Sequence, residues 1–114
     1  MKLSISPLKP KQVDKIYDID GVYLSSINSG IKYKGRDDLL LITFSKNTRV
    51  AGIFTKSTTA SAAVKWCKKN IKKNNARAII INAGNANVFT GQAGKLAVQK
   101  IISKLAFILN IKEE

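Results

Sequence analysis

The sequence predicts an α/β fold in the broad, mixed α+β sense, in which a mixed β-sheet has helices packed on one face. The sheet is predicted by two short runs, 39–44 and 78–82, that are almost wholly apolar, as in strands buried on both faces. The helices are predicted by the segments 60–73 and 92–110, where apolar residues recur every three or four positions. Residues 21–114 are expected to form a single domain, because a chain of 114 residues supplies one hydrophobic core.

The N-terminal part of the chain predicts a leader followed by a first strand. Pro7 and Pro10 interrupt scattered apolar residues, so 1–20 is expected to be irregular. The first strand is predicted over 21–32, where small polar residues lie between apolar ones, and 39–44 is predicted to be a central strand.

The segment Val50 to Thr55 predicts a third strand. It follows a turn marked by Asn47 and Thr48, and so short a connection favours an antiparallel hairpin with the strand at 39–44. The run 78–82 then predicts a further strand, buried on both faces.

The helix predicted over 60–73 has an apolar and a basic face. Val64, Cys67 and Ile71 recur at helical spacing, with Trp66 at the border, and five lysines occupy the opposite face: Lys65, Lys68, Lys69, Lys72 and Lys73. The favoured interpretation is a solvated helix face with Trp66 half-buried. The alternative is a small basic nucleic-acid-binding domain, in which Trp66 stacks on bases and the lysines neutralise phosphates.

The last helix, predicted over 92–110, is preceded by Thr90 as a candidate N-cap. Its apolar face is expected to pack on the sheet and comprises Val98, Ile101, Ile102, Leu105 and Leu109. Phe107 falls on the opposite face. An exposed aromatic ring there is either incidental or part of a surface for further polypeptide, as in a noncatalytic structural module.

Composition excludes several kinds of chemistry. The chain has no histidine, one cysteine and seven carboxylates, so histidine acid–base catalysis is excluded and a zinc or iron site is disfavoured. No metal or cofactor is therefore expected, and Cys67 on an apolar helix face is disfavoured as a nucleophile. The net charge of +13 comes from 17 Lys and three Arg, a bias we attribute mainly to A- and T-rich codon usage. No signal peptide or membrane span is visible, so a cytoplasmic location is expected.

Four blocks of sequence together resemble the N-terminal part of the glutamate N-acetyltransferase / ornithine acetyltransferase family of arginine biosynthesis. The blocks are SPLKPK with IDGVYLSS, GIKYKGRDDLLLI from Gly30, TRVAGIFTKSTTASAAVKWC from Thr48 and ARAIIINAGNANVFTGQAG from Ala76. They cover roughly residues 5 to 110. Ala63 is a small departure, since the family often has proline there.

The resemblance implies an enzyme that transfers acetyl from N-acetylornithine to glutamate, with acetyl-CoA as an additional substrate in some members. It also implies a four-layer αββα body and a precursor that cuts itself before a threonine, which becomes the nucleophile and forms an acetyl-enzyme. That threonine and the Thr-Gly pair of the oxyanion hole are absent here, so no catalytic residue can be assigned. The chain is expected to be a truncated N-terminal portion of the α chain, inactive alone, whose partners are the rest of the α chain and the β chain in an αβ hetero-oligomer.

The candidate substrate pocket lies in the turn between the strand at 78–82 and the last helix. One interpretation is structural: asparagines bond the turn backbone, and glycines permit positive φ. The other is that the turn walls the acyl or amino-acid pocket. Its candidate residues are Asn82, Gly84, Asn85, Asn87, Thr90 and Gly91. The favoured interpretation of the turn around Arg36 is structural, with Arg36 and Asp38 available for ion pairing. Arg36 is also a further candidate, because a guanidinium can grip a substrate carboxylate bidentately.

Overall fold

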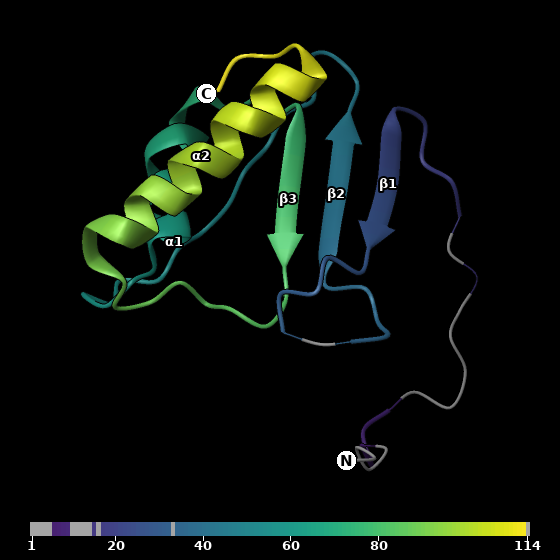
Figure 1. Ribbon diagram of the computed structural model, residues 1–114. Coiled ribbons are helices and arrows are strands. Elements are labelled where there is room, and N and C mark those ends of the chain that lie inside the picture. Colours follow the sequence, from purple (N-terminus) through teal and green to yellow (C-terminus); the bar gives the residue numbers. More distant parts are fainter. Residues whose placement is uncertain (1–5, 10–14, 16, 33, 114) are drawn as a thin grey trace.

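The computed structural model describes residues 6–9, 15, 17–32 and 34–113 (Figure 1). Most of the predicted leader, at 1–5, 10–14 and 16, lies outside these residues. The elements are, in chain order, β1 (Val22–Ile27), β2 (Leu39–Phe44), α1 (Ala62–Asn70), the 3-10 helix η1 (Ile71–Lys73), β3 (Ala78–Asn82) and α2 (Gly91–Leu109). Among the described helices, none is both long and apolar enough to span a bilayer.

The described strands form one sheet in the order β1-β2-β3, and both pairings are antiparallel. The α/β fold class and the central position of β2 are confirmed, but the described strands form an antiparallel sheet and not the predicted mixed one. The first strand is shorter than the predicted 21–32 and ends at Ile27. It ends there because the Asp38 carboxylate accepts the backbone N–H groups of Ser29 and Ile31, which turns the chain away from the sheet.

The predicted strand Val50 to Thr55 is wrong, because these residues form no strand. Both edges of β2 are already occupied, by β1 and β3, so a hairpin partner has no place to pair. The chain instead crosses toward the segment before β3. Arg49 and Asn75 make an isolated antiparallel bridge, and the backbone N–H of Val50 donates to the Asn74 carbonyl at 3.2 Å.

Both predicted helices are present, with clear ends. Ser61 caps α1, since its Oγ accepts the backbone N–H of Val64 at 3.2 Å. At the other end α1 tightens into η1, so the helical stretch ends at Lys73 as predicted. Helix α2 ends at Asn110, whose φ of 50° lies in the left-handed region and whose N–H reaches the carbonyls of the last turn.

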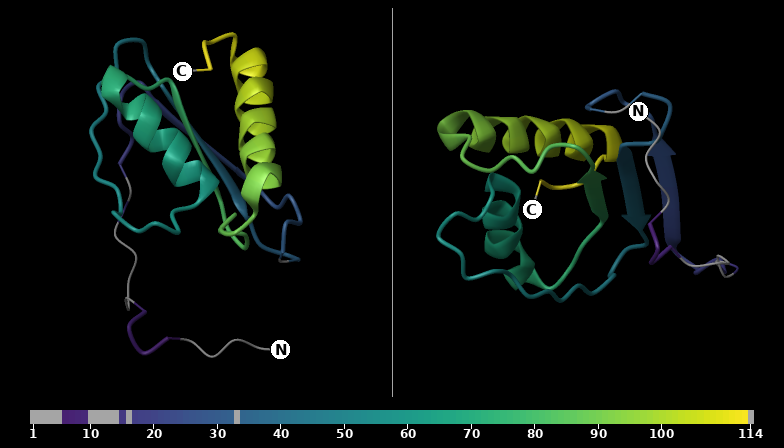
Figure 2. Two further views of the ribbon diagram at one scale, coloured as in Figure 1. Left: turned by 90° about the vertical axis from the view of Figure 1, so that its left-hand side faces the viewer. Right: turned by 90° about the horizontal axis from the view of Figure 1, so that it is seen from below.

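The helices contact each other on the β3 side of the sheet, and β1 lies at the far side (Figures 1 and 2). Of the predicted packing residues of α2, only Ile101 is exposed, and Phe107 is exposed as expected. The prediction that β3 is buried on both faces is wrong, because Ile79 and Ile81 expose 38% and 49% of their surface. Ala106, which exposes 7% of its surface, is the one buried apolar side chain among the described residues, so little of the apolar surface is enclosed.

Candidate functional site

Two connections meet at one end of the sheet. Ile27 at the end of β1, Leu39 at the start of β2 and Asn82 at the end of β3 lie in register across the three strands. The β1–β2 connection (28–38) and the β3–α2 connection (83–90) therefore leave the sheet side by side (Figure 1). The backbone N–H of Ala83 donates to the Asp38 carbonyl at 2.8 Å, which ties the second connection to the first.

Asp38 organises the β1–β2 connection from within. Its side chain is buried, with 3% of the residue surface exposed. One carboxylate oxygen accepts the N–H and Oγ of Ser29 at 2.6 and 2.7 Å, and the other accepts the N–H of Ile31 at 2.7 Å. The Ser29 hydroxyl, followed by the backbone N–H groups of Ser29, Ile31 and Lys32, lowers the pKa of Asp38, and these bonds outweigh the opposing effect of burial.

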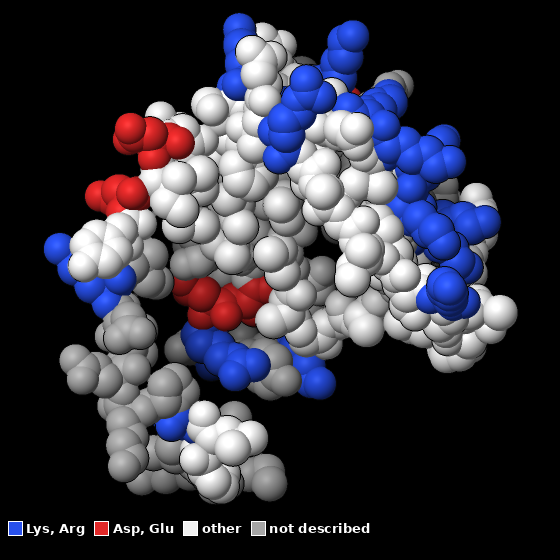
Figure 3. Space-filling model, turned by 180° about the vertical axis from the view of Figure 1, so that it is seen from behind, with Lys and Arg blue, Asp and Glu red and all other residues white. Residues whose placement is uncertain are grey.

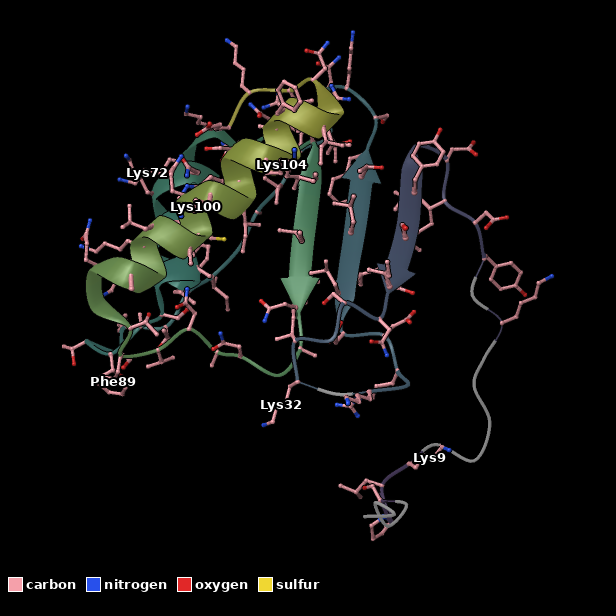
Figure 4. The ribbon with its side chains drawn as sticks, in the orientation of Figure 1. Lys9, Lys32, Lys72, Phe89, Lys100 and Lys104 are labelled. Carbon is pink, nitrogen blue, oxygen red and sulfur yellow. The ribbon has the colours of Figure 1, made fainter. Side chains whose placement is uncertain are left out.

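Lys32 lies directly against the second connection (Figure 4). A Cβ added to Gly84 would lie 2.6 Å from the Lys32 Cβ, closer than two such atoms approach. Gly84 also has φ +95°, which side chains rarely adopt. The turn after β3 therefore needs glycine at 84 for two reasons, which are its positive φ and the Lys32 side chain that lies against the turn at this point.

The asparagines of the turn bond mainly to the turn itself. The Asn82 amide donates to the Asn85 carbonyl at 2.9 Å, and the Asn85 side-chain oxygen accepts the N–H of Asn87 at 2.9 Å. Asn87, with φ 50°, donates its amide to the Gly94 carbonyl at 3.2 Å, which anchors the turn to the first turn of α2. These side chains therefore hydrogen-bond within the turn and to α2, as the structural interpretation of the asparagines expects.

Thr90 stands at the N-cap position of α2 but does not cap it. Its side chain makes no hydrogen bond to the first turn of the helix, so the predicted capping role is wrong. The hydroxyl instead donates backward, to the Asn87 side-chain oxygen at 2.7 Å. The residue at the cap has φ −94° and ψ 1°, outside the extended region that lets an N-cap side chain reach the helix.

Gly94 and Phe89 are features that the sequence analysis missed. A Cβ on Gly94 would lie 1.9 Å from the Thr90 Oγ1 and 2.6 Å from the Asn87 Oδ1, so α2 packs on the turn through a bare glycine. Phe89 has φ 57° and exposes 87% of its surface (Figure 4). A glycine four residues into a helix was the available signal for the first. No local pattern predicts positive φ at a phenylalanine.

The remaining candidates lie at the same end of the sheet. Arg36 is an exposed residue of the β1–β2 connection, which also contains Lys32 and Asp38. Gly91 begins α2 with φ 54°, so it completes a turn in which four residues have positive φ: Gly84, Asn87, Phe89 and Gly91. The structure brings the predicted turn residues together and adds the Asp38-held connection beside them.

Helix α1 is the centre of the basic surface. Figure 3 shows one group of Lys and Arg along one side of the molecule, while other Lys and Arg lie beside the acidic groups on the same face. Trp66 is half-buried as predicted, at the border of this surface. Cys67, predicted on an apolar face, is exposed as a residue, while burial of its thiol raises its pKa above the usual value. A raised pKa keeps the thiol protonated, which agrees with a nonnucleophilic role.

An apolar hollow of about 350 Å³ lies between α1, α2 and the start of β3. Trp66, Cys67, Ile71, Ile102 and Leu105 line part of it. None of the candidate residues of the turn borders this hollow, nor does Arg36. The candidate site and this hollow are therefore separate places in the molecule.

The structure defines the chain as an α/β module, and comparison with known proteins identifies which one. A family model described as the ArgJ family matches residues 23–114. The chain belongs to the ArgJ family.

The relatives and solved structures agree. The chain is 50% identical over 95 residues to the arginine biosynthesis bifunctional protein ArgJ of Bradyrhizobium diazoefficiens, covering 83% of this chain and 23% of that protein. It is 42% identical over 113 residues to ArgJ of Bartonella quintana, and the match covers 99% of this chain and 27% of that protein. The crystal structure of ornithine acetyltransferase from Mycobacterium tuberculosis, complexed with ornithine, superposes with a TM-score of 0.76 at 30% identity, covering 80% of this chain and 48% of that one. The chain thus spans about a quarter of the length of these curated relatives.

Proposed function

We propose that the chain contributes one part of an acetyltransferase of arginine biosynthesis, which transfers acetyl from N-acetylornithine to glutamate through an acetyl-threonine intermediate. The single observation that carries this proposal is the ArgJ family match over 23–114. The reaction, and a nucleophilic threonine that lies outside these residues, are what the family resemblance implies. The chain alone is therefore inactive in the proposal, and acetyl-CoA is a possible second acetyl donor while no cofactor takes part.

Within the proposed enzyme, the β3–α2 connection shapes a wall of the substrate pocket. Support comes from its rigidity, because Asn82, Asn85 and Asn87 bond the turn and Gly94 lets α2 pack against it. A rigid turn can present its backbone to a ligand without an ordering cost. Arg36, in the neighbouring connection, supplies a guanidinium that can grip the carboxylate of an amino-acid substrate.

The proposed partners are the rest of the α chain and the β chain, in an αβ hetero-oligomer. The fold itself supports a need for more polypeptide, because few apolar side chains of the described residues are enclosed. The relatives support it as well, since each is about four times as long as its matched segment.

The test is a chimera of Bradyrhizobium diazoefficiens ArgJ in which this chain replaces the matched segment. We expect the chimera to exchange acetyl between N-acetylornithine and glutamate and the isolated chain to show no exchange. A folded, self-cleaved chimera without any exchange would overturn the proposed activity.

The pocket wall is tested in the same chimera with Asn85→Ala and Arg36→Lys. A pocket role predicts that kcat/KM falls by about tenfold or more while Tm changes little, since a lysine cannot reproduce the bidentate grip. If Tm falls and kcat/KM of the folded enzyme stays unchanged, the turn is structural only.

A further inference from the structure

The part of the chain that forms β2, β3 and the described helices contains no carboxylate. Residues 39–112 include 13 Lys and Arg and no Asp or Glu. Codon usage rich in A and T explains many lysines, but it does not remove carboxylates, whose codons can end in A or T as well. A solvated helix face usually carries both signs of charge, which pair at a spacing of three or four residues. The helices α1, η1 and α2 have no acidic residue with which to form such pairs.

Helix α1 and the following η1 concentrate this positive charge. Their five lysines are all exposed, and we call them the lysine stripe: Lys65, Lys68, Lys69, Lys72 and Lys73. Three pairs of the stripe lie four residues apart along the helical stretch, and like charges at this spacing destabilise a helix. Lys72 lies on the side of the helices that is away from the sheet (Figure 4). An anionic partner would remove the repulsion within the stripe.

A hollow of about 300 Å³ lies beside the stripe, between α1 and α2. The residues that line it are Trp66, Lys69, Asn70, Lys73, Gln99 and Glu113. Trp66 offers an indole ring, the two lysines offer ammonium groups, and the two amides offer hydrogen-bonding groups. A nucleotide has a planar base that stacks on aromatic rings and a phosphate that binds ammonium groups. The hollow therefore combines the groups that recognise both parts of a nucleotide.

The same surface lacks the features that a membrane or a duplex would need. Helices that bind membranes insert exposed, large apolar side chains, and none of the large apolar residues of α1 and η1 is exposed. In a duplex the bases are stacked inside, so Trp66 would have no base to contact. In a single strand the bases are free to stack on a protein ring. Lysines lack the bidentate fork that reads base edges, so the stripe recognises phosphates without regard to sequence.

We infer that the lysine stripe and the hollow beside it bind single-stranded nucleic acid without sequence preference. Lys65, Lys69 and Lys73 lie about one helical turn apart and contact successive phosphates. Trp66 stacks on a base that enters the hollow. This activity is independent of the proposed acetyl transfer, because none of the candidate residues of the β3–α2 turn lines the hollow, and neither does Arg36.

The test titrates the whole chain into labelled single-stranded DNA of random sequence over a range of salt concentrations. Fluorescence anisotropy of the DNA measures the affinity. Trp66 is the single tryptophan, so quenching of its emission reports stacking directly. The binding variant combines Lys65→Gln with Lys69→Gln. The matched control combines Lys34→Gln with Lys46→Gln, which remove the same charge at exposed positions outside the helices.

We expect the unchanged chain to bind at low salt with quenching of Trp66. The binding variant should lose about tenfold or more in affinity, and its slope of log K against log salt should be shallower by about 1.4, since each phosphate contact with a single strand contributes about 0.7. The control should stay close to the unchanged chain in both quantities.

Glu113 provides a change in the opposite direction. It is the one carboxylate among the described residues that line the hollow, and the Gln99 amide donates to it at 2.6 Å. A carboxylate beside a phosphate opposes binding, so Glu113→Gln should tighten the complex. A weaker complex in this variant would contradict a phosphate in the hollow.

Four other results would overturn the inference. The first is no binding by the unchanged chain at low salt, and the second is an equal loss of affinity in the binding variant and the control, which would reflect net charge alone. The third is tighter binding to polyglutamate, to duplex DNA or to vesicles of anionic phospholipid than to the single strand. The fourth is equal affinity for adenosine monophosphate, which would assign the hollow to free nucleotides.

Discussion

The Asp38 carboxylate accepts two hydrogen bonds from Ser29, one from its backbone N–H at 2.6 Å and one from its Oγ at 2.7 Å. The same carboxylate binds the N–H of Ile31, so one buried side chain sets the path of the β1–β2 connection. The Asp38 carbonyl accepts the N–H of Ala83, and this residue thereby joins the two connections of the candidate site.

Asp38→Asn is expected to lower the Tm of the chain by several degrees at pH 7, because an amide NH2 would face backbone donors. The pKa of Asp38 is lowered in the folded state, chiefly by the Ser29 hydroxyl, so its stabilisation is complete above the unfolded pKa of about 3.9. It is lost as the pH falls through the folded pKa. The Tm difference between the two proteins should therefore shrink below about pH 4, as measured by thermal melts across pH.

Asp20→Asn is the control for this experiment, because Asp20 is exposed. This variant should have the Tm of the unchanged protein both at pH 7 and below about pH 4. A difference between Asp38→Asn and the unchanged protein that stays constant down to pH 3 would contradict the role of the Asp38 charge.

Gly84→Ala is expected to destabilise the chain more than Gly35→Ala does. Both glycines have positive φ, at +95° and +77°, which costs an alanine roughly 1–2 kcal/mol. Only at Gly84 would the new Cβ meet another atom, the Lys32 Cβ at 2.6 Å, whereas nothing lies within 4 Å at Gly35. Urea unfolding of the two variants measures the difference.

The contact with Lys32 is isolated by a double-mutant cycle. Lys32→Gly removes the opposing Cβ, so it should restore part of the stability lost in Gly84→Ala. Simple additivity of the two changes would show that the connections do not touch at this point.

The sequence predicted those parts of the fold that depend on local patterns. The periodicity of α2 and of α1 together with η1, and the apolar runs of β2 and β3, place these elements within one or two residues, because helical spacing and strand composition are local properties. The prediction of a strand at Val50 to Thr55 failed because its pairing depends on whether β2 has a free edge, and only the full topology decides that. Burial of β3 failed for the same kind of reason, since it depends on what covers Ile79 and Ile81.

The candidate site was predicted as a list of residues and not as an arrangement. The Asn and Gly residues of the turn were found because they permit unusual backbone angles, and the structure gives positive φ to Gly84, Asn87 and Gly91. Asp38 was weighed only as an ion-pair partner, because a single carboxylate in a loop sequence carries no sign that it will accept three hydrogen bonds. Thr90 has the residue type of an N-cap, but its hydroxyl donates to the Asn87 Oδ1, and its backbone angles lie outside the extended region.

Phe89→Gly is expected to be more stable than Phe89→Ala by about 1 kcal/mol. Phe89 has φ 57°, and an alanine would keep that strain while a glycine would relieve it. Since 87% of the phenylalanine surface is exposed, both changes remove the same small amount of packing. Chemical denaturation measures the pair, and an alanine variant as stable as the glycine variant would show that the backbone at 89 is unstrained.

Gly94→Ala is expected to destabilise the chain although alanine is the better helix former by about 1 kcal/mol. Gly94 lies inside α2, where a Cβ would stand 1.9 Å from the Thr90 Oγ1 and 2.6 Å from the Asn87 Oδ1. The helix must then move away from the turn, or the turn must give up the bond between Thr90 and Asn87. Ala97→Gly, at an exposed position of the same helix, is the control and should destabilise by propensity alone. Gly94→Ala and Ala97→Gly are opposite substitutions three residues apart, yet both should lower the free energy of unfolding. A Gly94→Ala variant that is more stable than the unchanged protein would mean that α2 does not pack on the turn.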